Sequence, residues 1–158
     1  MTHITEEIRL QIKELVKKSL QVAFDNGQLP ENDIPEILVE TPKERDFGEF
    51  STNIAMQMAK VMKKPPRVLA DIIISNMDTK GTYIEKAECA GPGFINFYLK
   101  DNWLYDALKI IEKEKENYGR LDIGKGKKVM VEFVSANPTG PLHMGNARGG
   151  ALGDCIAS

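Results

Sequence analysis

The spacing of the apolar residues alternates between a helical and a strand-like period along the first 118 residues, and this order restricts the folds open to the chain. The first segment is predicted to be an amphipathic helix that ends near Asn26-Gly27 and Pro30. Its apolar residues recur every three or four positions: Ile4, Ile8, Ile12, Leu15, Val16 and Leu20.

Two pairs of strands are predicted further along. The first pair consists of a short strand at 36–40 and a second one within 45–53. The second pair, at 83–90 and 94–100, is joined by the tight connection Gly91–Gly93.

Helices fill the rest of this region. Two helices separated by Pro65-Pro66 lie between the strand pairs, and Ser51 or Thr52 is the expected N-cap of the first. A last helix is predicted over 101–118. The apolar stripe of that helix is expected to be Trp103, Leu104, Leu108 and Ile111.

The order of elements predicts an α+β fold with two layers, because consecutive strands tend to pair and to form a largely antiparallel sheet with helices on one face. We expect a first domain over 1–118, a Gly-rich and charged linker over 119–127, and a second unit over 128–158. The second unit begins with a strand at 129–134 and a helix from His143, the start of a Rossmann-like α/β domain that looks truncated.

Composition excludes several classes of protein. With 42% hydrophobic and 28% charged residues, the chain has enough apolar material for a core and no apolar run of membrane-spanning length. The net charge of −2 means that any nucleic-acid partner would need a local basic patch. Cys89 and Cys155 stand far apart, which favours free thiols in a reducing compartment, and the two histidines exclude a His-rich metal site.

The segment SANPTGPLHMGNARG holds the richest set of candidate functional residues. A strand followed by a turn and a helix start offers unpaired backbone amides to an anion. Gly145 would let a phosphate or an adenine approach the backbone, while His143, Asn146 and Arg148 could contact phosphate. A Gly-rich helix start packed on a sheet explains the same residues without a ligand, and 149–153 favours such close packing.

The strand at 94–100 has one apolar face and one mixed face. Alternation places Ile95, Phe97 and Leu99 on one side. The other side carries two aromatic rings, an amide and a cation, the groups that an unpaired RNA base requires: Phe94, Asn96, Tyr98 and Lys100. Packing under a helix is the alternative for this face.

Glu132, the segment SANPTGPLHMGNARG and the following helix together resemble the signature of the arginyl-tRNA synthetases, a family of class I aminoacyl-tRNA synthetases. HMGN takes the place of the HIGH motif of that class. The resemblance continues through YGRLDIGKGKKVMVEFVSANPTG, GPGFINFYL and DFGEFSTNIAMQMAK, and so covers nearly the whole chain in the expected order.

The resemblance implies roles for individual residues. His143 would contact the ATP phosphates and act with Asn146 in catalysis, and Gly145 would lie under the adenine, so that these three residues bind ATP. Arginine would be held by Glu132, Ser135, Asn137 and His143. The whole motif region comprises Ala136, Asn137, Pro138, Thr139, Gly140, Pro141, Leu142, His143, Met144, Gly145 and Asn146.

One position departs from the usual motif. The last His of the motif is replaced by Asn146, which keeps a neutral donor but cannot carry positive charge toward the α-phosphate. This departure concerns the rate of the reaction and not the family.

The resemblance also implies a function for the first domain, which corresponds to the additional domain that contacts the D-loop of tRNA. Phe94 and Asn96 fall where the family reads a D-loop base, and Tyr98 and Lys100 complete the predicted tRNA-binding face. The segment around Phe47 is interpreted mainly as structural.

The expected reaction joins arginine to its tRNA through an arginyl-adenylate, with ATP as a substrate and magnesium bound to it. We expect a cytoplasmic protein without a membrane partner, and a monomeric intact enzyme. The 158-residue chain lacks the KMSKS loop and the anticodon-binding helices of the family, so we expect it to be inactive alone. The alternatives are a stand-alone RNA-binding module and another nucleotidyltransferase.

Overall fold

The computed structural model describes residues 4–120 and 124–158. The chain divides into two compact units, Met1–Arg120 and Leu121–Ser158, and each is described by itself. The predicted linker at 119–127 includes residues 121–123, which lie outside the described residues. The predicted domain limits therefore stay predictions.

The first unit is an α+β domain, as the sequence predicts. Four helices or helical turns lie before or between its strands, and two follow them. The elements come in this order: α1 (Ile4–Asp25), η1 (Arg45–Phe47), β1 (Phe50–Thr52), α2 (Ile54–Met62), α3 (Pro66–Ser75), β2 (Ile84–Ala90), β3 (Phe94–Leu99), α4 (Asn102–Glu114) and η2 (Lys115–Asn117).

The three strands form one antiparallel sheet in the order β1-β3-β2. β3 is the central strand, so that Asn96 pairs with Ser51 of β1 on one side and with Glu88 of β2 on the other. The predicted antiparallel pairing of the strands at 83–90 and 94–100 is confirmed.

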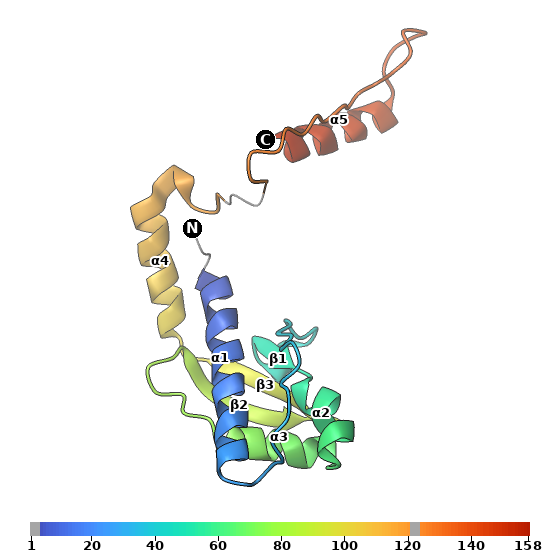
Figure 1. Cartoon of the computed structure of the whole chain (residues 1–158). Helices are drawn as coiled ribbons and strands as arrows, with labels where there is room; N and C mark the ends of the chain where they lie inside the picture. The colour runs from blue at the N-terminus through green and yellow to red at the C-terminus, as the bar shows by residue number, and fades with distance from the viewer. Residues whose placement is uncertain (1–3, 121–123) are drawn as a thin grey trace. The chain divides into compact units, whose positions relative to one another are not determined.

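The core lies between the helices and one face of this sheet, and α1 crosses in front of the sheet in Figure 1. Ile95 and Phe97 are fully buried and Leu99 is nearly so, as the alternation along the strand predicts. The apolar stripe predicted for α1 is also buried along its length. Burying a side chain of this size contributes roughly 1.5–3 kcal/mol, so these two elements supply much of the stabilisation of the unit.

The predicted strand at 36–40 is wrong except at its last residue. Ile37 and Val39 are buried in alternation, but only Glu40 pairs with the sheet, through an isolated bridge to Ser51. The reason is that β1 is only three residues long, so it offers little backbone for a neighbouring strand to pair with.

Two details of the helices also differ from the predictions. Asn53, and not Ser51 or Thr52, occupies the N-cap position of α2, because Ser51 and Thr52 belong to β1. In α4 the side facing the core carries Trp103, Ala107 and Ile110, whereas three predicted stripe residues are exposed: Leu104, Leu108 and Ile111. The observed and the predicted stripe are offset by one residue, and the spacing of the apolar residues fits both.

The second unit consists of α5 (Met144–Ala157) and an extended segment that packs along it. The strand predicted at 129–134 is absent from the described residues, so the predicted Rossmann-like start is not confirmed. A strand is stabilised by hydrogen bonds to a neighbouring strand, and no other strand lies within 124–158. Val134 moreover has a φ of +58°, which interrupts extended geometry.

None of the helices within the described parts of the chain has the length and apolar character needed to cross a membrane.

The buried hydroxyl of Thr52 provides a test of the core. This side chain is 2% exposed, and its Oγ1 finds no hydrogen-bond partner among the described residues. We expect Thr52→Val to raise the free energy of unfolding by about 1 kcal/mol, because a methyl of similar shape replaces an unsatisfied polar group. Urea unfolding followed by the fluorescence of Trp103, the single tryptophan, measures the change.

Ser19 is the matched control, because its buried hydroxyl does donate a hydrogen bond, to the carbonyl of Leu15. Ser19→Ala is expected to leave stability unchanged or lower it by up to about 1 kcal/mol. A Thr52→Val protein less stable than the parent protein would contradict the assignment of an unsatisfied group.

Candidate nucleic-acid interface and nucleotide-binding turn

A pocket of about 360 Å³ lies on the side of the sheet opposite the core. Residues from four separate segments line it: Glu40, Thr41, Pro42, Lys43, Phe47, Ser51, Ala90, Gly91, Phe94 and Asn96. The sheet supplies the floor, since Ser51 pairs with Asn96 and Ala90 pairs with Phe94. We call it the sheet pocket.

Phe94 is the aromatic wall of the sheet pocket. Its side chain is 37% exposed although it begins a central strand. The preceding turn is held in place from α3: the Arg67 guanidinium donates a hydrogen bond to the carbonyl of Gly91, and a Cβ on Gly93 would lie 2.6 Å from the Cβ of Pro66. Gly93 has a φ of +132°, so both backbone conformation and close approach require glycine there.

Asn96 contributes the polar group of the sheet pocket. The residue is 4% exposed, yet no hydrogen bond found among the described residues involves its side-chain amide. Its amide atoms are open to the pocket, because Thr52 Oγ1 is the only fully enclosed side-chain polar atom without a hydrogen-bond partner among the described residues. An amide that is sheltered, lines a pocket and lacks a protein partner is therefore suited to bind a polar ligand.

The remaining wall comes from the chain before β1. Backbone bonds of 2.9 and 2.8 Å join Glu40 and Ser51, and the Tyr98 hydroxyl donates to the carbonyl of Asp46 in η1. Phe47, at the end of η1, is 44% exposed toward the pocket. Gly48 follows it and approaches the backbone of β3 closely. This close approach accounts for the glycine within the segment DFGEF.

Two of the four residues predicted to bind tRNA lie outside the lining of the sheet pocket. The Lys100 ammonium donates to the carbonyl of Thr82 and borders a different, polar pocket. The ring of Tyr98 lies 4.2 Å from the ammonium of Lys86, which also forms a 2.8 Å ion pair with Glu88. The structure brings Phe94 and Asn96 together and leaves Tyr98 and Lys100 in other contacts.

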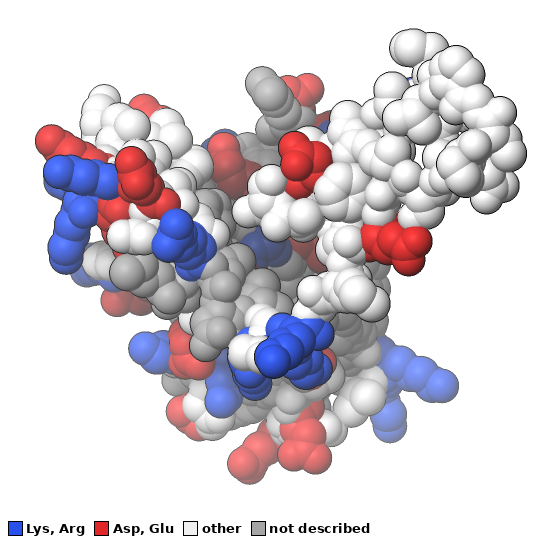
Figure 2. All heavy atoms as spheres, turned by 90° about the horizontal axis from the view of Figure 1, so that it is seen from above, with Lys and Arg blue, Asp and Glu red and all other residues white. Residues whose placement is uncertain are grey.

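These contacts affect the electrostatics of the outer face. Burial raises the pKa of the Tyr98 phenol, and the nearby Glu88 carboxylate raises it further. The hydrogen bond to Glu88 raises the pKa of Lys86, while the same bond lowers the pKa of Glu88. The Lys86–Glu88 pair is the only ion pair on the outer face among the described residues, and its two charges cancel. On the face of the molecule shown in Figure 2, basic and acidic side chains are also interspersed.

In the second unit, His143 caps α5. Its Nδ1 accepts a hydrogen bond of 3.1 Å from the backbone of Gly145, and the Asn146 side chain accepts one of 3.2 Å from the backbone of His143. Because Nδ1 accepts a hydrogen bond, the proton of the neutral imidazole lies on Nε2. Nε2 of His143 and the amide nitrogen of Asn146 thus remain as donors for an anion.

The residues predicted to hold arginine are less closely grouped. The Ser135 hydroxyl donates a hydrogen bond to the carboxylate of Glu132, whereas Asn137 is exposed in the following turn. The predicted close packing is confirmed for two of the glycines, against an extended segment and not a strand: a Cβ on Gly153 would overlap the ring of Phe133, and one on Gly150 would lie 3.0 Å from Val134, whereas Gly149 has open space around it.

The sequence analysis did not predict that residues 40–43 and Phe47, which come from the chain before β1, form a wall of the sheet pocket. These residues show no periodicity, and the segment was expected to be a strand and a turn. The Thr41-Pro42 pair was the available signal, because proline keeps the preceding residue extended and prevents regular pairing.

Comparisons with known proteins agree with one class. Residues 10–99 match the family described as "Arginyl tRNA synthetase N terminal domain". Over all 158 residues, the chain is 66% identical to the arginine–tRNA ligase of Acetivibrio thermocellus and 61% identical to that of Ruminiclostridium cellulolyticum. In each case it covers 28% of the relative, so the chain spans little more than a quarter of the length of these curated relatives.

The fold has a counterpart among solved structures. The arginyl-tRNA synthetase of Plasmodium falciparum matches 92% of this chain and 27% of its own, with a TM-score of 0.59 at 22% identity. The family match over residues 10–99 gives the class of protein, that of the aminoacyl-tRNA synthetases. The chain belongs to the arginyl-tRNA synthetase family and corresponds to its N-terminal part.

Gly48 offers a test of how the pocket wall is built. Its φ is +80°, and a Cβ would lie 2.4 Å from the carbonyl oxygen of Phe97. Gly81 has a similar φ of +74° but open space around it. Gly81→Ala is therefore expected to lower the free energy of unfolding by about 1–2 kcal/mol, the cost of placing alanine in the left-handed conformation. Gly48→Ala should lower the free energy of unfolding by about 1–3 kcal/mol more, because the backbone must shift.

Denaturant unfolding of both variants, followed by Trp103 fluorescence, separates the two contributions. Equal losses of stability in the two variants would show that the close approach of Gly48 to β3 is relaxed without cost.

Proposed function

We propose that the intact protein joins arginine to its tRNA with ATP, and that the first unit of this chain binds the D-loop of that tRNA by enclosing one base in the sheet pocket. In the proposed reaction the arginine carboxylate attacks the α-phosphate and releases pyrophosphate. A terminal ribose hydroxyl of the tRNA then takes the arginyl group and AMP leaves. Membership of the family and the names of the relatives support this reaction.

The observation that supports the proposed RNA contact is that the side chains of Phe94 and Asn96 line the same pocket. An exposed aromatic ring provides a stacking surface, which contributes roughly 1–3 kcal/mol per base. The Asn96 amide offers one donor and one acceptor in the same cavity, so it can read the hydrogen-bonding edge of the stacked base.

The net charge of the chain indicates the kind of RNA contact. A protein of net charge −2 with its outer Lys86 paired to Glu88 gains little from phosphate attraction alone. Base-specific contacts must then supply most of the affinity of this unit. This argument favours an unpaired loop base over a double-stranded helix, whose base edges are poorly accessible to side chains.

In the second unit we propose that His143 Nε2 and the Asn146 amide contact the ATP phosphates at the start of α5, with Gly145 beneath the adenine. The Glu132–Ser135 pair would border the arginine, where a carboxylate attracts the ammonium or guanidinium group. The described residues include no group of three or more His, Cys, Asp or Glu that could hold a metal ion.

Both cysteines are free, which fits the reducing compartment expected from the sequence. We propose the cytoplasm as the place of action.

A binding titration tests the RNA contact. Fluorescence anisotropy would compare a tRNA that accepts arginine with the same tRNA carrying abasic nucleotides in its D-loop, which keep the phosphates and remove the bases. We expect the 158-residue chain to bind the intact tRNA about tenfold more tightly, the loss expected from one stacked base. Phe94→Ala should remove the part of this difference that comes from stacking, and Asn96→Ala the part that comes from hydrogen bonds to the base.

Asn102→Ala is the matched control, since Asn102 is exposed and borders the polar pocket instead of the sheet pocket. It is expected to behave like the parent protein. Equal affinity of the parent protein for intact and abasic tRNA would refute the proposed base contact.

Arginine-dependent exchange between pyrophosphate and ATP tests the second unit. We expect no detectable exchange from the 158-residue chain, with or without tRNA, because the residues proposed to bind ATP and arginine lie on one helix end and one extended segment, and all of them except the half-buried Asn146 are exposed. Exchange above the level of a His143→Ala control would overturn this prediction.

A further inference from the structure

The wall of the sheet pocket formed by Glu40–Lys43 has few backbone ties to the rest of the fold. Only Glu40 pairs with the sheet, and the residues after it belong to no helix or strand until η1 begins. Pro42 has no N–H to donate. Before Glu40 the buried side chains of Ile37 and Val39 also hold the segment. The residues after Glu40 would be expected to move unless a side chain fixes them.

Arg9 supplies that additional tie from α1. Its Nη1 donates a hydrogen bond to the carbonyl of Val39, and its Nη2 donates one of 3.0 Å to the hydroxyl of Thr41. One guanidinium thus holds the chain on both sides of Glu40. Arg9 is not among the residues that line the sheet pocket, so it contacts the wall on the side away from the cavity.

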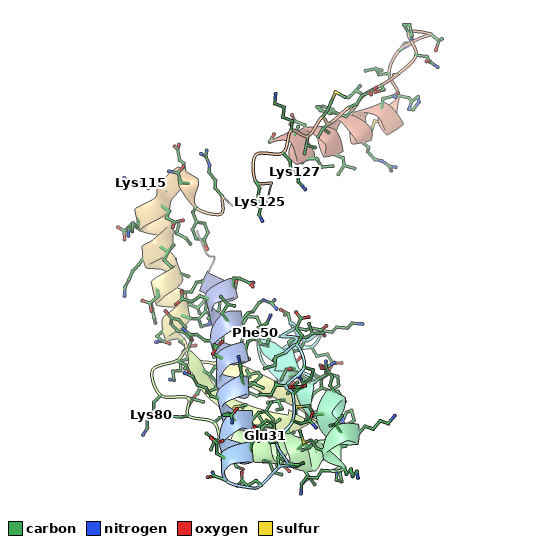
Figure 3. The ribbon with its side chains drawn as sticks, viewed as in Figure 1. Glu31, Phe50, Lys80, Lys115, Lys125 and Lys127 are labelled. Carbon is green, nitrogen blue, oxygen red and sulfur yellow. The ribbon has the colours of Figure 1, made fainter. Side chains whose placement is uncertain are left out.

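Two further contacts orient the guanidinium. It lies 4.8 Å from the centroid of the Phe50 ring, and the figure with side chains shows Phe50 beside α1 (Figure 3). Phe50 is a buried residue of β1, so the stacked ring relates Arg9 to the sheet. The Glu6 carboxylate lies 3.8 Å from Nε but is well exposed, which makes it a minor contribution.

We infer that Arg9 is a positioning residue for the base-binding pocket, which it keeps closed by clamping the segment from Val39 to Thr41 onto the edge of the sheet. This inference rests on the proposed binding of an RNA base in the sheet pocket. Without the clamp, the wall would move away from Phe94 and Asn96, and the base would lose contacts on that side. Binding to phosphates alone would not change.

Lysine cannot replace arginine in this role. The planar guanidinium donates in two directions at once and stacks on an aromatic face, whereas an ammonium is a compact point charge on a flexible chain. Arg9→Lys therefore keeps the charge of α1 and removes the two-point clamp. The change isolates geometry from electrostatics.

The test measures three quantities on Arg9→Lys and on the control Lys18→Arg, a charge-conserving exchange at an exposed site of the same helix. The first is affinity for the intact tRNA and for the tRNA with an abasic D-loop. We expect Arg9→Lys to lose roughly fivefold to tenfold for the intact tRNA, equivalent to about 1–1.4 kcal/mol. Its affinity for the abasic tRNA and the salt dependence of binding should match those of the control.

The second quantity is hydrogen exchange of the amides of Glu40 and Ser51, which form the single bridge of the wall. Their protection should fall in Arg9→Lys while the amides between β2 and β3 keep theirs. The third is the urea midpoint from Trp103 fluorescence, which shows whether the variants are folded under the conditions of the titration.

The outcomes separate the two proposals. If the parent protein does not discriminate against the abasic tRNA, the proposed base contact fails, whatever the exchange data show. If the parent protein discriminates and folded Arg9→Lys discriminates equally, or if the Glu40 and Ser51 amides stay protected, the positioning role of Arg9 is overturned. Loss of affinity for both tRNAs in parallel with a lower urea midpoint would show that Arg9 stabilises the whole unit instead.

Discussion

The packing of β3 between β1 and β2 is the constraint on which the first unit depends. Its inward residues, Ile95 and Phe97, are fully buried against the helices, and its outward residues, Phe94 and Asn96, line the sheet pocket. Because side chains alternate along a strand, the burial of one set fixes the orientation of the other. A shift of register by one residue would place the pocket residues in the core. The same hydrophobic packing that stabilises the domain therefore also orients its candidate RNA-binding groups.

The elements around β3 complete the site through contacts that are individually weak. The turn at Gly91 is held by Arg67, the η1 segment by Tyr98, and the segment after Val39 by Arg9. Each tie is one or two hydrogen bonds, and a single hydrogen bond contributes only about 0.5–1.5 kcal/mol to stability. Such contacts contribute little to whether the sheet folds, and each of them ties a segment that lines the pocket or adjoins its lining. Functional substitutions in this unit need not be the ones that unfold it.

The second unit has a different physical basis. The capping of α5 by His143 and the close contact of Gly153 with Phe133 are local, and they form within a few tens of residues. The strand expected at 129–134 needs a partner strand, which 124–158 does not provide. The cap of α5 therefore forms from residues of the motif itself, whereas a sheet would need a partner strand from outside 124–158.

The sequence by itself determined the helical and strand periods, the α+β class, the faces of α1 and β3, and the family, because these follow from local spacing and from contiguous motifs. It also pointed to Phe94 and Asn96. Only the tertiary structure decided that Glu40 forms a single bridge, that α4 turns Ala107 and Ile110 to the core, and that Lys100 binds the carbonyl of Thr82. It also revealed the clamp from Arg9 to Val39 and Thr41, which are 30 and 32 residues away. Contacts of that kind depend on which segments the folded core brings together, and no local pattern in the chain encodes them.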